Sequence, residues 1–236
     1  MRAPEPSLVL WDMDQTLIEI GSSTRHAYSA AFLRATGRPL TQPWRFDGRT
    51  ELAAATEVLR AHAVEPSPSM LHAFVSLIVE ELHARADDMR RDGRVLPGAR
   101  EALVACAAVP GVHQSVLTGN LRPLAVLKAD VFGLSRHLDL RVGAFGGDAL
   151  DRIDLPRHAW RRAAKHLSHR FSGVDTVLIG DTVLDVATAK AAGARVVAVA
   201  TGWTGEPALR AAGADVVLAD LTDTGAAVDA ITAGRR

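Results

Sequence analysis

Hydrophobic and polar positions divide the chain into two kinds of segment. From Gly111 onward, short apolar runs alternate with longer stretches of helical periodicity, a pattern typical of β-α-β units and a parallel sheet. An earlier apolar run at residues 8–11 shows no alternation and predicts a strand that is buried on both faces. The other expected strands lie at residues 114–117, 140–145, 176–179, 195–200 and 215–218. Together these runs predict one sheet with helices between most of its strands.

The long interval between the first two expected strands has a different pattern. Helical periodicity runs through residues 27–35, 50–62 and 70–89, and no run from 22 to 92 resembles a strand. Breaks at residues 37–43 and 65–68 separate these helices. The sequence therefore predicts an α/β protein with a Rossmann-like three-layer core, formed by residues 1–20 and 93–236, and an inserted all-helical domain at residues 21–92.

Carboxylates follow two of the expected strands. Asp12 and Asp14 follow the first strand in LVLWDMDQTL, and Asp181 and Asp185 lie at the start of the helix in LIGDTVLDVATAKAAG. The carboxyl ends of parallel strands meet at one edge of the sheet, so we expect these acids to converge, with oxygen ligands that suit a divalent cation. The alternatives are that Asp12 and Asp14 only open a turn, or that Asp181 and Asp185 serve the helix N-terminus.

A third segment, SVLTGN, adds polar groups after another expected strand. Thr118, Gly119 and Asn120 lie at a strand-to-helix turn, where a hydroxyl and main-chain N–H groups can bind a phosphate oxygen. In the alternative interpretation, Thr118 caps the following helix and Gly119 is a turn glycine.

These motifs, in this order, resemble those of the haloacid dehalogenase-like hydrolase superfamily: DxDxT at residues 12–16, Thr118 after a later strand, and GDxxxD at residues 180–185. The helical insertion resembles the type 1 cap of that superfamily, so the similarity spans nearly the whole chain. The resemblance implies Mg²⁺-dependent phosphoryl transfer, in which Asp12 attacks phosphorus and Asp14 protonates the leaving oxygen and then activates water.

The same resemblance implies a metal site and a class of substrate. Asp12, Asp181 and the main-chain oxygen of Asp14 would hold Mg²⁺, and Asp185 would support them. Asp14 favours phosphate chemistry, because the 2-haloacid dehalogenases of the superfamily lack an acid at its position. We therefore expect a phosphatase, similar to phosphoglycolate phosphatases, that acts on a small phosphorylated metabolite. The alternatives are a phosphomutase and a catalytically weak phosphate-binding or regulatory protein.

One departure from the superfamily pattern concerns its third motif. A lysine usually precedes the helix before GDxxxD, but Lys128, Lys165 and Lys190 are poorly placed for that role. Arg152, in ALDRIDLPRHAW, is the expected replacement, because its planar guanidinium can bind phosphate and pair with a carboxylate. Arg157 is the second candidate, and a solvated surface charge is the alternative for both arginines.

Three further positions carry expectations about the entrance to the site. Gln15 stands where the usual DxDGT motif has glycine, which restricts the backbone beside Asp12, although we expect activity to be retained. Arg25 and Arg49, in the helical insertion, could reach an anionic tail of the substrate, and surface roles are the alternative.

Composition excludes several other classes of function. Lys plus Arg and Asp plus Glu each number 27, so no overall field favours nucleic acid or an anionic membrane. Residues 143–147 lack the dinucleotide fingerprint, and no P-loop is present. We expect His166 and His169 to lie on a solvated basic helix face, and Cys106 to be a buried core residue. The N-terminal sequence resembles neither a signal peptide nor a membrane span, which predicts a cytoplasmic protein, and the oligomeric state is left open.

Overall fold

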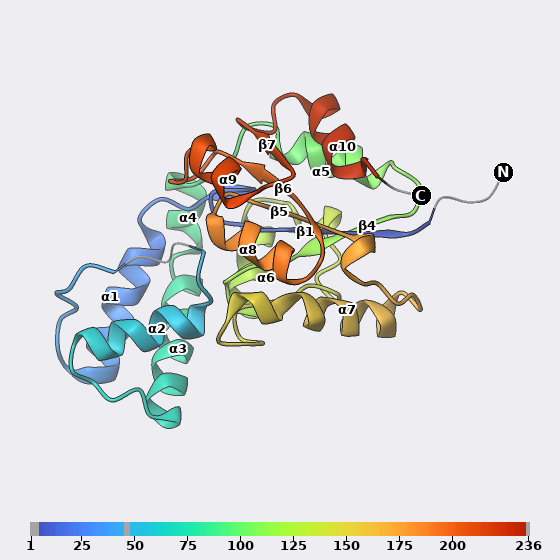
Figure 1. The fold of residues 1–236 in the computed structure, drawn as a ribbon. Helices are drawn as coiled ribbons and strands as arrows, with labels where there is room; N and C mark the ends of the chain where they lie inside the picture. The colour runs from blue at the N-terminus through green and yellow to red at the C-terminus, as the bar shows by residue number, and fades with distance from the viewer. Residues whose placement is uncertain (1–4, 45–47, 235–236) are drawn as a thin grey trace.

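The computed structural model describes residues 5–44 and 48–234 of the chain. Its centre is a five-stranded parallel sheet with the strand order β4-β1-β5-β6-β7 (Figure 1). These strands are β1 (Ser7–Trp11), β4 (Val112–Val116), β5 (Thr176–Gly180), β6 (Arg195–Val199) and β7 (Val216–Leu218). β1 lies between β4 and β5, so the residues that follow these three strands come out side by side at one edge of the sheet.

Helices cover both faces of this sheet. One face packs against α5 (Ala99–Ala107), α6 (Arg122–Val131) and α10 (Thr224–Thr232), and the other against α7 (Leu155–His166), α8 (Val183–Ala191) and α9 (Glu206–Ala212). Alternate residues of β1 divide between the two sides: Val9 and Trp11 join the first apolar cluster, and Leu8 and Leu10 join the second. The predicted three-layer Rossmann-like core and the doubly buried first strand are therefore confirmed.

The helices between β1 and α5 lie to one side of the sheet (Figure 1). They are α1 (Ser23–Thr36), α2 (Glu51–Ala61), α3 (Pro68–His83) and α4 (Ala86–Asp92). Their core is aromatic: Phe74 meets Tyr28 and Phe32 edge to face, with ring centroids 5.7 and 5.9 Å apart. A short antiparallel pair, β2 (Ile18–Glu19) and β3 (Arg94–Val95), joins the two connections to the core. The domain boundaries proposed from the sequence stay a prediction.

The expected strand at residues 140–145 is absent from the structure. Ala144 alone makes a bridge there, to Leu117. The Asp139 carboxylate accepts from the amide of Arg141 at 3.1 Å, and the Asp139 carbonyl accepts from the amide of Val142 at 3.1 Å. These hydrogen bonds use the amides of Arg141 and Val142, which a β-ladder would otherwise need. The apolar run therefore packs without forming a strand.

The expected helix at residues 70–89 is two helices. α3 ends at His83 and α4 begins at Ala86, because Arg85 leaves the helical conformation with φ −104° and ψ 19°. Asp87 and Asp88 lie in the first turn of α4, where acidic residues stabilise a helix N-terminus. Apolar periodicity continues through this break, which explains why the sequence did not reveal it.

Two other expectations concern the burial of Cys106 and the absence of a membrane span. Cys106 is fully buried in α5, as predicted, and burial raises its pKa to about 11. Across the described ranges, no helix is both long and apolar enough to span a bilayer.

Candidate active site

A cavity of about 530 Å³ lies at the carboxyl edge of the sheet, between the strand ends and the inserted helices. The segments after β1, β4 and β5 line its floor, and residues from α1, α2 and the segment before α2 line its opposite side. The cavity brings together seven of the eight residues that the sequence singled out for the site: Asp12, Asp14, Thr118, Gly119, Asn120, Arg152 and Asp181. Asp185, the eighth, lies directly behind them and pairs with Arg152.

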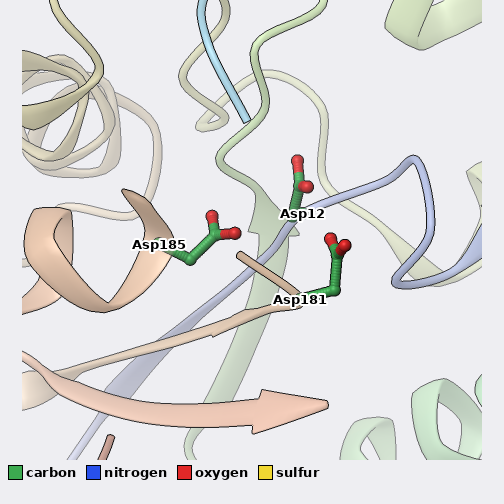
Figure 2. A group of neighbouring side chains, drawn as sticks. All are labelled: Asp12, Asp181 and Asp185. Carbon is green, nitrogen blue, oxygen red and sulfur yellow. The ribbon is translucent and has the colours of Figure 1, made fainter. Parts of the chain in front are cut away.

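Three carboxylates form a buried cluster beside the cavity (Figure 2). Asp12 follows β1, Asp181 follows β5, and Asp185 lies in the first turn of α8. One oxygen from each lies within 4.8 Å of the other two. Burial raises the pKa of Asp12 to about 6, with Arg152 opposing the rise. Burial and the neighbouring charge of Asp12 raise the pKa of Asp181 to about 8. The cluster is short of positive charge, and its oxygen donors fit a divalent cation.

Asp181 does not cap α8, although that was the alternative for this residue. The N-cap is Thr182, whose hydroxyl oxygen accepts from the amide of Asp185 at 3.2 Å. The carboxylate of Asp185 in turn accepts from the amide of Thr182 at 3.0 Å, which completes a capping box. Asp181 instead accepts from the hydroxyl of Thr16 at 3.2 Å, so it is available to a ligand, whereas Asp185 serves the helix as well as the cluster.

Arg152 supplies a buried positive charge to this cluster. Its guanidinium lies 3.1 Å from Asp12 and also pairs with Asp185. The same guanidinium donates to the main-chain oxygens of Gly48, at 2.8 Å, and Leu117, at 3.3 Å. Its Nε is buried and has no hydrogen-bond partner among the described residues, so the guanidinium retains donor capacity for an anion. Because all these partners are far from Arg152 in the sequence, only the folded chain brings them together.

Thr118 is not a helix cap, contrary to the alternative interpretation. α6 begins only at Arg122, after an N-cap that makes no side-chain hydrogen bond. The hydroxyl oxygen of Thr118, fully buried, accepts from the amide and the side-chain nitrogen of Asn120, at 3.2 and 2.8 Å. These contacts hold the Thr118–Gly119–Asn120 turn against the cavity without using the turn to start the helix.

The inserted helices dock on this turn through their backbone. The amide of Glu51, at the start of α2, donates to the main-chain oxygen of Gly119 at 2.7 Å. A Cβ at Gly119 would overlap the main-chain oxygen of Arg49, and a Cβ at Gly146 would overlap that of Gly119. Glycine is therefore required at both positions for close approach. Gly146, in the run at residues 143–147 that matches no dinucleotide motif, therefore has a packing role.

Lys128 belongs to the site, although the sequence pattern did not place it there. It lies in the last turn of α6 with its side chain 2% exposed, and its ammonium contacts Asp14 at 2.6 Å. The signal that could have found it is a charge on an apolar helix face: Leu124 and Ala125, four and three positions earlier, are both buried. A lysine in such a stripe needs a buried acceptor.

The other candidates from the sequence lie outside the cluster. Arg157 is exposed and pairs with Asp154 at 3.0 Å, so the surface interpretation holds for it. Lys165, Lys190 and His166 are also exposed, and His169 stacks edge to face on Phe171. Arg25 and Arg49 both line the cavity while remaining exposed, and Arg49 pairs with Glu57.

Gln15 has a left-handed backbone, with φ 64°. This conformation costs a residue with a side chain about 1–2 kcal/mol and costs glycine little, which explains the glycine of the usual motif. The amide of Gln15 donates to the Ile18 oxygen at 2.8 Å, and its own oxygen accepts from the Thr201 hydroxyl, so the turn holds despite the strain.

Replacing Gln15 with Gly is therefore expected to raise the free energy of unfolding by about 0.5 kcal/mol, because relief of strain outweighs the added freedom of the unfolded chain. Urea unfolding of both proteins would measure the difference. Gln42→Gly is the matched control: Gln42 is an exposed loop residue without a positive φ, so the same change there should lower stability. A clear loss of stability in Gln15→Gly would contradict the strain argument.

Comparisons with known proteins agree with this architecture. The model of the family described as haloacid dehalogenase-like hydrolase matches residues 9–190. The chain is 30% identical, over 216 residues, to a plasmid-encoded phosphoglycolate phosphatase of Cupriavidus necator, with 90% of this chain and 89% of that protein covered.

Solved structures share the fold. CbbY from Rhodobacter sphaeroides, determined with phosphate, superposes with a TM-score of 0.73 at 20% identity, covering 95% of this chain and 99% of that one. A putative β-phosphoglucomutase from Bacteroides vulgatus has a TM-score of 0.69 at 19% identity, covering 98% and 92% of the two chains. At such low identity these two structures bear on the fold alone.

Proposed function

The chain belongs to the haloacid dehalogenase-like hydrolase family, and from this premise we propose that it is a Mg²⁺-dependent phosphatase acting on a small phosphorylated metabolite. The observation that carries the proposal is the pairing of Asp12 with Arg152, at 3.1 Å, beside a buried carboxylate cluster and an open cavity. A nucleophile, a phosphate-binding cation and a place for a divalent metal thus lie next to one another.

Asp12 would attack phosphorus and form an aspartyl-phosphate, displacing the alcohol of the substrate. Arg152 holds one oxygen of Asp12, and its unpartnered Nε could donate to a phosphate oxygen. The main-chain amides of the Thr118–Gly119–Asn120 turn would bind further phosphate oxygens. Asp14 would protonate the departing alcohol and then take a proton from the water that cleaves the aspartyl-phosphate.

Mg²⁺ fits the cluster and would be held by Asp12, Asp181 and the main-chain oxygen of Asp14, with Asp185 in support. When bound, it would neutralise the charge that otherwise keeps a carboxylate away from a phosphate dianion. The raised pKa values of Asp12 and Asp181 support this assignment, because two buried acids that resist ionisation alone gain most from a cation.

This assignment predicts how stability depends on pH. Asp12 and Asp181 titrate near 3.8 when unfolded, but at about 6 and about 8 when folded. Between these values the folded protein holds more protons, so in EDTA its stability should fall as pH rises from about 4 to about 8. Mg²⁺ should raise the melting temperature, and by more at pH 8 than at pH 5, because its ligands must be deprotonated.

Thermal unfolding at both pH values, with EDTA or with Mg²⁺, would measure this effect. Asp181→Asn should reduce both the pH dependence and the response to Mg²⁺, while Asp229→Asn, which changes an exposed acid that does not line the cavity, should alter neither. An equal Mg²⁺ effect at the two pH values would contradict the assignment.

We propose that the substrate carries a second anionic group. The relative from Cupriavidus necator is named a phosphoglycolate phosphatase, and phosphoglycolate has a carboxylate beside its phosphate ester. Arg25, on α1, lines the cavity and is exposed to it, whereas Arg49 is already paired with Glu57. Arg25 is therefore the better candidate for binding this group.

Arg25→Gln is expected to raise KM for phosphoglycolate about tenfold, which corresponds to about 1.4 kcal/mol, with little change in kcat, since the carboxylate that it would bind takes no part in the reaction. Steady-state phosphate release would test this. Arg60→Gln, on an exposed position of α2 outside the cavity, is the control. A fall in kcat at unchanged KM would place Arg25 in the chemistry instead.

The proposed function itself is tested by phosphate release from a panel of phosphorylated metabolites, with and without Mg²⁺. Release that requires Mg²⁺ would support it. Phosphoryl transfer to an acceptor hydroxyl is the second candidate, because the proton transfers assigned to Asp14 would serve a hydroxyl acceptor as well as water. Product analysis would identify this reaction by a phosphorylated acceptor without free phosphate. Phosphate binding without turnover would favour a regulatory protein.

A further inference from the structure

Lys128 is an ionisable group that the mechanism above does not use. Its ammonium is buried, which is costly unless acceptors compensate for lost water. Two acceptors do so: Oδ2 of Asp14 and Oδ1 of Asn120, each at 2.6 Å. Both acceptors belong to residues that line the cavity.

The two carboxylate oxygens of Asp14 differ in their hydrogen bonds. Lys128 and the side-chain nitrogen of Asn120 both donate to Oδ2, at 2.6 and 2.8 Å. In the described part of the chain, Oδ1 of Asp14 takes part in no hydrogen bond. Asn120 is itself held by Thr118 and Lys128, so its orientation is set. Two donors thus hold Oδ2 of Asp14, whereas Oδ1 remains free to interact with a molecule in the cavity that Asp14 lines.

A second carboxylate, Glu51 at the start of α2, acts on the same ammonium from the inserted helices. Glu51 is buried and accepts from the hydroxyl of Tyr28 at 2.5 Å. Burial raises its pKa to about 7, while the Tyr28 hydrogen bond and the charge of Lys128 oppose the rise. The amide of Glu51 donates to the main-chain oxygen of Gly119. Docking of α2 on the core thus brings this carboxylate near Lys128, whose charge lowers its pKa, and near Asp14, whose charge raises it.

We propose that Lys128 is a positioning residue: with Asn120 it clamps Oδ2 of Asp14 and so presents Oδ1 for proton transfer to and from the reacting groups. This inference rests on the proposed phosphatase function. The side chain of Asp14 is 39% exposed, so without the clamp it can rotate towards solvent and away from the leaving oxygen. Replacing Lys128 should therefore slow the steps that require proton transfer, and it should leave phosphate binding unchanged.

Two substrates separate these steps. Cleavage of phosphoglycolate needs a proton on the departing alkoxide, whereas nitrophenolate leaves p-nitrophenyl phosphate without one. In single-turnover experiments with Mg²⁺, Lys128→Met should slow the cleavage of phosphoglycolate by about 30-fold, a part of what general acid catalysis contributes. The first turnover of nitrophenolate release should change by less than about threefold. Lys165→Met, an exposed lysine on α7, should change neither rate.

A double-mutant cycle tests whether Lys128 acts through Asp14. Lys128→Met should add no more than about a twofold loss to Asp14→Asn, because the group it positions is already gone. Lys128→Gln, which keeps a donor on a shorter side chain, should lie between wild type and Lys128→Met, and it provides the same test if Lys128→Met does not fold. Thermal unfolding would check whether Lys128→Met and Lys128→Gln are folded.

Equal losses on the two substrates, or full additivity with Asp14→Asn, would overturn the role of Lys128 while leaving the phosphatase function intact. A wild-type protein that cleaves neither substrate would instead overturn the proposed function, and this role for Lys128 with it.

Discussion

Asp12→Asn is expected to lower the rate of phosphate release by at least about 10⁴-fold, because an amide cannot form the proposed aspartyl-phosphate. The fold should survive the change. Asp12 sits in a buried cluster where burial raises its pKa and Asp185 and Asp14 add to the rise, so a neutral side chain of the same shape relieves repulsion. Arg152 keeps Asp185 as a partner.

Phosphate release and thermal unfolding together would check this prediction. In EDTA at about pH 8, the melting temperature of Asp12→Asn should equal or exceed that of the wild type, since fewer buried charges face one another. The stabilisation by Mg²⁺ should shrink, because the amide is a weaker ligand. Asp154→Asn, an exposed acid paired with Arg157, is the control. Turnover above about one hundredth of wild type would mean that Asp12 is not the nucleophile.

Arg152→Met should destabilise the protein as well as inactivate it. Removing one partner from a buried ion pair typically costs about 3–5 kcal/mol, since the remaining charges are left without compensation. Here two carboxylates, Asp12 and Asp185, lose their shared cation. In this variant the pKa of Asp12 should rise further, because in the wild type the charge of Arg152 opposes the effect of burial. The deficit should therefore grow as pH rises from about 4 to about 8.

Urea unfolding in EDTA at several pH values would measure the deficit. Adding Asp185→Asn should restore part of the lost stability, because it removes one uncompensated charge. Arg157→Met should leave stability and activity nearly unchanged, since that side chain is exposed. Arg152→Lys should recover little activity, because an ammonium cannot span the four oxygens that the guanidinium reaches. Full stability in Arg152→Met would contradict the account of the cluster.

Much of the core follows from local patterns in the chain. The buried run that ends at Trp11 has no polar alternation, and such a run forms a strand covered on both faces. The residues that follow parallel strands lie at one edge of the sheet. Asp12, Thr118 and Asp181 therefore come together through the strand arrangement itself. The prediction was wrong for the run at residues 140–145, where the Asp139 carboxylate accepts from the amide of Arg141 and favours a turn.

Partners that come from distant elements could not be predicted in the same way. Arg152 was expected near Asp12, but its bonds to Gly48 and Leu117 and the orphaned Nε depend on how three segments pack. Lys128 does not lie before the helix that precedes GDxxxD, where the superfamily pattern has its lysine, so the pattern gives it no role. Its side chain reaches Asp14 across 114 positions of sequence, a relation that no spacing rule encodes.

The amino-acid sequence was enough to establish the layers of the core, the edge at which the chemistry lies and the carboxylates that gather there, because buried strands and strand-end positions are set by local hydrophobicity and by the geometry of parallel pairing. Packing in three dimensions was needed to assign a partner to each charge. Lys128 and Glu51 come from separate helices, and their pairings are selected by burial, which forces each buried charge to find an acceptor or a donor.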